Sequence, residues 1–111
     1  MSVNRRRGEV EAILDGKPRT LCLTLGALAE LEDAFAADDL GALVERFASG
    51  RLSARDIMRI IGAGLRGAGT QVTDDDVAAM QVEGGASAYA AIVSELLTAT
   101  FGGREPQQPN P

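Results

Sequence analysis

Apolar positions across residues 53–69 recur at the spacing of an amphipathic helix. One face carries Ile57, Ile60, Ile61, Gly64 and Leu65, at positions i, i+3, i+4, i+7 and i+8. At about 100° per residue, the arginines of this stretch fall on the opposite face. Ser53 and Asp56 have the spacing of a capping box, and the glycines at 67 and 69 favour a helix end. The pattern predicts a central helix with one buried face and one basic face.

Residues 9–25 alternate between apolar and polar side chains, which is typical of two strands. The apolar positions that share a face are Val10, Ala12 and Leu14 in the first run and Leu21, Leu23 and Leu25 in the second. Asp15 and Gly16 between the runs indicate a β-hairpin turn. Pro18 favours a four-residue loop over a two-residue loop, because proline cannot donate a hydrogen bond within the ladder. An isolated hairpin is marginal in water, so its leucine face is expected to pack on helices.

Four further segments have apolar residues at helical spacing. They span about residues 24–37, 39–50, 73–84 and 87–101. Asp38 or Asp39 can cap the second of these, and Thr73 with Asp76 repeats the capping-box spacing in the third. The predicted fold class is therefore α+β and mostly α: an N-terminal β-hairpin followed by about five short helices.

The predicted domain organisation is simple. Residues 9–102 are expected to form a single hairpin-plus-helices domain, which suits a chain of 111 residues. Residues 1–8 are predicted to be a flexible basic arm, and residues 103–111 a disordered proline-rich tail.

Charge and composition narrow the function classes. The chain has 11 basic and 16 acidic residues, a formal net charge of −5, so indiscriminate binding to nucleic acid or anionic membrane is not expected. Its single cysteine excludes an internal disulfide, and it has no histidine, the commonest acid–base group and metal ligand. No apolar run approaches a membrane span, and no secretory signal is visible at the N-terminus. A cytoplasmic location is the expectation.

Three motifs carry candidate chemistry, and each has a simpler structural interpretation. Residues 62–67 match G-x-G-x-x-G, but they lie inside the predicted helix rather than between a strand and a helix, so close packing is favoured over phosphate binding. The acids at 74–76 lack the spacing of a calcium loop and suit a helix N-terminus. Cys22 has no histidine to act as its base, so a packed or half-exposed thiol is expected. We expect no cofactor, no metal and no enzymatic activity.

The basic face of the central helix is the feature most open to function. Arg51, Arg55, Arg59 and Arg66 are the predicted partner-binding residues. A solvated helix face with local ion pairs is an equally good interpretation of the same pattern. DNA binding through residues 51–66 is a weaker alternative, because the following helix lacks polar residues suited to reading bases.

Most of the chain resembles the small tail proteins of gene transfer agents and related phages. The resemblance covers roughly residues 4–102 and is carried by NRRRGEV (4–10), LCLTLGALAELE (21–32), FASGRLSARD (47–56), GAGLRG (62–67) and the closing LL-x-x-x-FG (96–102). Proteins of that family are described both as tail tube proteins and as tail assembly chaperones. The resemblance brings no catalytic motif with it.

The resemblance implies a non-enzymatic role in virion assembly. A chaperone of this kind would bind the tape-measure protein, a long helical protein, until tail tube subunits polymerise around it; tube subunits and further copies of this chain are the other implied partners. The alternative is a structural tail component, a tube or minor tail protein, that stays in the particle. Because tubes usually need extensive β-sheet and this sequence predicts one hairpin, the pattern favours the chaperone.

Overall fold

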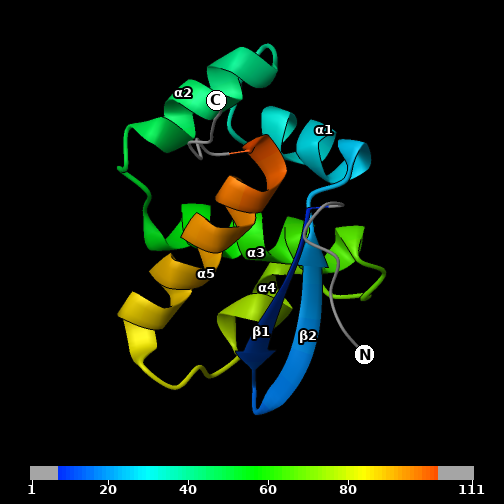
Figure 1. Cartoon of the computed structure of the whole chain (residues 1–111), viewed down its shortest axis with the longest axis vertical. Coiled ribbons are helices and arrows are strands. Elements are labelled where there is room, and N and C mark those ends of the chain that lie inside the picture. The colour runs from blue at the N-terminus through cyan, green and yellow to red at the C-terminus, as the bar shows by residue number, and fades with distance from the viewer. Residues whose placement is uncertain (1–7, 103–111) are drawn as a thin grey trace, which may run out of the picture.

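The computed structural model describes residues 8–102, which form a hairpin and five helices (Figure 1). In chain order these are β1 (Glu9–Leu14), β2 (Lys17–Cys22), α1 (Leu25–Ala34), α2 (Leu40–Ala48), α3 (Ala54–Gly67), α4 (Asp74–Ala78) and α5 (Gly85–Phe101). The predicted α+β, mostly α fold class is confirmed. The predicted basic arm, apart from Gly8, and the predicted tail at 103–111 lie outside the described residues.

The hairpin has a two-residue turn, so the preference for a four-residue loop was wrong. Leu14 pairs with Lys17 and Ile13 with Pro18 in an antiparallel register. Asp15 and Gly16 have φ of 59° and 78°, as a type I′ turn requires. The pair that closes such a turn is hydrogen-bonded, so the next pair, which contains Pro18, is not. Proline is tolerated there because its missing N–H would point away from the partner strand.

The alternation predicted for β2 holds only as far as Leu23. Leu21 is fully buried and Leu23 nearly so, but Leu25 is 78% exposed. The strand ends at Cys22, and Leu25 is the first residue of α1, so the period-two pattern no longer decides its direction.

Three helices begin at the predicted caps, Asp39, Ser53 and Thr73, and α1 begins behind Thr24, for which no cap was predicted. The side chains of Thr24, Asp39, Ser53 and Thr73 each accept a hydrogen bond from a backbone N–H of the helix that follows. α5 instead begins at Gly85, two residues earlier than predicted, behind a left-handed Gly84 with no side-chain cap. α4 ends at Ala78, well before the predicted end of this helix at about residue 84.

α3 lies at the centre of the packing, as predicted. It crosses the middle of the molecule behind α5 and the hairpin (Figure 1) and contacts β2, α1, α4 and α5. Ile60, Ile61 and Leu65 of this helix are fully buried against the apolar face of the hairpin and the other helices. The smaller α2 is less well covered, since Leu40 and Val44, two of its apolar residues at helical spacing, are 40% and 37% exposed.

Candidate partner-binding surface

Glycines at the G-x-G-x-x-G positions let neighbouring elements approach α3 closely. A Cβ on Gly64 would lie 2.9 Å from Leu96 Cδ2 and 3.2 Å from Leu21 Cβ. A Cβ on Gly62 would overlap the carboxylate of Asp74, and one on Gly67 would overlap the backbone carbonyl of Cys22. All three glycines lie within α3. The motif therefore serves helix packing, and the phosphate-binding interpretation is excluded because no strand–helix junction presents these backbone N–H groups.

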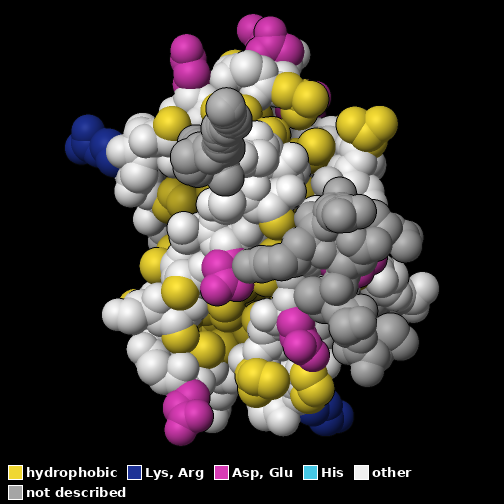
Figure 2. All heavy atoms as spheres, viewed as in Figure 1, with side chains coloured by type: hydrophobic (Ala, Val, Ile, Leu, Met, Phe, Trp, Pro, Cys, Tyr) yellow, Lys and Arg dark blue, Asp and Glu magenta, His cyan; other side chains and the backbone are white. Residues whose placement is uncertain are grey.

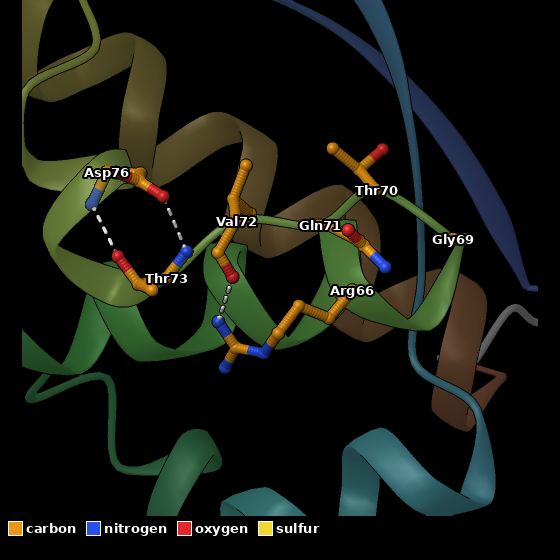
Figure 3. A pocket seen from close by; sticks show the side chains of 7 residues that line it. All are labelled: Arg66, Gly69, Thr70, Gln71, Val72, Thr73 and Asp76. Carbon is orange, nitrogen blue, oxygen red and sulfur yellow. Dashed lines mark hydrogen bonds between the residues drawn. The ribbon is translucent and has the colours of Figure 1, made fainter.

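Arg66 is held by groups from three other parts of the chain. Its guanidinium forms ion pairs with Glu30 of α1 and Asp74 of α4. It also donates to the backbone carbonyl of Val72, 3.0 Å away (Figure 3). The two hydrogen bonds with Glu30, together with the one with Asp74, outweigh the effect of burial and raise the pKa of Arg66 above its ordinary value. Two carboxylates thus neutralise this arginine, which also lines an open depression of 540 Å³ with residues 69–73 and Asp76.

The predicted basic face is divided by these contacts. Arg59 is half-buried, and its Nη1 donates to the carbonyl of Ala34 at the end of α1, 3.4 Å away. Arg51 and Arg55 are exposed, and within residues 8–102 neither side chain forms an ion pair or a hydrogen bond. The four predicted partner-binding residues therefore comprise two that tie helices together and two that present uncompensated charge.

Arg46, which precedes these four arginines in the sequence, has a structural role that the pattern did not reveal. Arg46 of α2 donates to Oδ2 of Asp56, 3.1 Å away, and its guanidinium carbon lies 5.3 Å from the ring centroid of Phe35. Asp56 is the only buried charged residue among those described, at 6% exposure. It belongs to the Ser53 capping box, so this contact fastens α2 to the start of α3.

An apolar groove opens between α3, α4 and α5, and sequence reasoning missed it. Its volume is 240 Å³, and its lining includes Ala54, Met58 and Ile61 from α3, Val77 and Ala78 from α4, and Tyr89 from α5. No charged side chain lines it. On the face seen in Figure 2, apolar side chains are also exposed beside α5, with acidic side chains above, below and between them. Ala54 and Met58 widen the apolar face of α3, and this is the feature of the sequence that could have indicated the groove.

The acids at residues 74–76 and Cys22 are the other candidates for chemistry that the sequence raised. Asp76 forms a capping box with Thr73, as expected for acids at a helix start. Across residues 8–102 no group of three or more acidic, cysteine or histidine side chains is arranged to hold a metal ion. Cys22 is half-buried on β2.

Replacing Arg66 by methionine is expected to lower the free energy of unfolding by about 1 kcal/mol, because the partly exposed ion pairs are screened by water. Urea titration would measure the loss, and high salt should shrink it. Since the folded-state pKa of Arg66 is raised, the stabilisation is complete below the ordinary pKa of an arginine and is lost only as the pH rises through the folded-state pKa. The difference in free energy of unfolding between the unchanged protein and Arg66→Met should therefore be the same at about pH 8 and about pH 10. Arg55→Met is the matched control and should change stability by less than about 0.5 kcal/mol.

The described residues contain no helix that is long and apolar enough to span a membrane. No curated protein and no solved structure matches the chain. Residues 7–103 match a family described as "Phage tail tube protein, GTA-gp10". This match covers nearly all of the chain, which therefore belongs to this family of phage and gene transfer agent tail proteins.

Proposed function

We propose that this protein is a non-enzymatic tail assembly chaperone that binds the tape-measure protein during tail morphogenesis. The observation that carries the proposal is the exposed pair Arg51 and Arg55 at the start of the central helix. Within the described part of the chain, no acidic group neutralises either of them. Charges without an internal partner are available to a binding partner. In a complex, such charges set the orientation of the two proteins and their association rate.

The mostly helical build suits a helical client. A tape-measure protein presents apolar stripes that would associate with one another before the tube encloses them. A small domain with an amphipathic central helix covers such stripes by the helix-in-groove mode, in which apolar side chains one turn apart enter a complementary surface. The non-enzymatic part of the proposal rests on the absence from the sequence of histidine, the commonest acid–base group.

A structural component of the tail tube is the second candidate, and the family description favours it directly. The sheet of the described residues has two strands, so each strand has one edge without a strand neighbour. Such edges can pair with a strand of the next subunit, which is one way that a ring of identical chains closes. In this case the hairpin edge, rather than the arginine pair, would be the main contact.

Quantitative mass spectrometry of purified particles beside the lysate of the producing cells separates the two candidates. A chaperone acts during assembly and leaves, so the protein should be abundant in the lysate and depleted from particles by at least an order of magnitude relative to a tube subunit. A fixed copy number per particle, in a whole-number ratio to the tube subunit, would overturn the chaperone and establish the structural component.

A further inference from the structure

The groove between α3, α4 and α5 has a buried floor and an exposed rim. Ile61 and Val77 form the floor, with exposures of 0% and 2%, and Ala54, Ala78 and Ala86 on the rim are exposed. The walls belong to three consecutive helices, and the volume of 240 Å³ remains open after they have packed. An open apolar hollow of this kind marks a binding site for a partner that presents apolar side chains of matching shape.

The chemistry of the lining selects a helix as the occupant. The groove offers aliphatic side chains and the ring of Tyr89, whose hydroxyl already donates to the backbone carbonyl of Met80, 2.7 Å away. An extended segment lying here would leave its backbone N–H and C=O groups without partners, which costs free energy when they are buried. A helix satisfies its own backbone groups and needs to present only apolar side chains.

The charges beside the groove specify the flanks of that helix. Arg55 follows Ala54 and lies three residues before Met58, so it stands beside the α3 wall, and Arg51 lies just before this helix. On the α4 wall, the exposed Asp75 lies one turn before Ala78. A complementary helix would carry acidic residues on the flank that faces α3 and a basic residue on the flank that faces α4.

We propose that this groove docks an amphipathic helix of a partner protein, with apolar residues at i, i+3 or i+4 and i+7 and an acidic flank beside Arg51 and Arg55. The inference rests on the proposed function, because it assigns to this surface the helical client of the chaperone. It adds which surface of the chain makes the contact, and which residues of the client enter it.

The test blocks the rim while leaving the core unchanged. The full chain would be titrated with the tape-measure protein of the same source organism, with binding followed by calorimetry. Ala78→Lys with Ala86→Glu places two charges on exposed rim positions and should weaken binding by about tenfold or more. Ala79→Lys with Ala90→Glu is the matched control: it makes the same changes at the C-cap of α4 and on α5, at exposed positions that do not line the groove. The control should bind within about twofold of the unchanged protein.

A second pair of variants tests the charged flank. Arg51→Glu with Arg55→Glu should weaken binding by about tenfold and reduce its salt dependence. Reversing acidic residues on the bound helix of the client to lysine should restore the affinity of this variant. Circular dichroism and thermal unfolding of every variant confirm that the fold is retained.

The outcomes distinguish the groove from the proposed function. Equal binding by the rim variant and its control would show that the groove is not the docking site, and it would leave the proposed chaperone function unchanged. No binding of the tape-measure protein by the unchanged chain would overturn both. If the rim variant instead abolished self-association of the chain, as measured by sedimentation, a second copy would be the occupant and the inference would be wrong.

Discussion

Replacing Gly67 by alanine is expected to lower the free energy of unfolding by about 2–3 kcal/mol, as overpacking of a closely fitted contact does. The added Cβ would overlap the backbone carbonyl oxygen of Cys22 and lie 3.4 Å from Ala27 Cβ. Because the carbonyl belongs to the hairpin backbone, it can move only if β2 moves away from the last turn of α3. Alanine is the better helix former by about 1 kcal/mol, and the predicted loss is what remains after that gain.

Gly26→Ala is the matched control for this prediction. Gly26 also lies in a helix, near the start of α1, and the nearest atom to its added Cβ would be Thr24 Oγ1, 3.8 Å away. The substitution should leave stability unchanged or raise it by up to about 1 kcal/mol. Chemical denaturation of both variants measures the difference. If Gly67→Ala proved as stable as Gly26→Ala, the close approach of α3 to β2 would be contradicted.

Local signals account for the parts of the fold that the sequence predicted. A capping box at Ser53 and another at Thr73 are each formed within four residues, so their spacing alone identifies the start of α3 and of α4. The Asp15–Gly16 turn is similarly local, because both residues tolerate positive φ. The turn length was harder to predict, since whether Pro18 interrupts the ladder depends on the register itself.

The contacts of the predicted basic face depend on groups that are distant in the sequence. Helical periodicity places Arg66 correctly on the side of α3 away from the core residues, but it says nothing of what else packs there. Glu30 lies 36 residues away and Asp74 comes from the next helix, and both reach the guanidinium only in the folded chain. Gly62 makes room for this arrangement, a requirement that no pattern of charges reveals.

The apolar groove was hidden for a related reason. Periodicity identifies which face of α3 is apolar, but it cannot tell how much of that face α4 and α5 will cover. Helical periodicity places Ile61 and Met58 on one continuous apolar face of α3. In the structure Ile61 is fully buried, whereas Met58 is half-exposed beside the groove. A surface left over by helix packing becomes visible only after the helices have been placed.

Replacing Asp56 by alanine is expected to lower the free energy of unfolding by about 2 kcal/mol. The substitution removes an N-terminal capping interaction, worth about 1 kcal/mol, and leaves Arg46 without its buried acceptor. Oδ2 of Asp56 accepts from the backbone N–H of Ser53 at 3.0 Å and from Arg46 Nη2 at 3.1 Å. The estimate stays below the usual loss for a fully buried pair because the Arg46 side chain is 43% exposed.

The second capping box of the chain supplies the control for this prediction. Asp76 accepts from the backbone N–H of Thr73 at 2.8 Å in the same arrangement, but it is exposed and forms no ion pair within residues 8–102. Asp76→Ala should therefore cost only about 0.5–1 kcal/mol, the value of a cap alone. The excess measured for Asp56→Ala reports burial and the contact with Arg46, and it should fall by about 1 kcal/mol when Arg46→Ala is already present. Equal losses for the two aspartates would show that the link between α2 and α3 contributes nothing to stability, and that α2 is held by its apolar contacts alone.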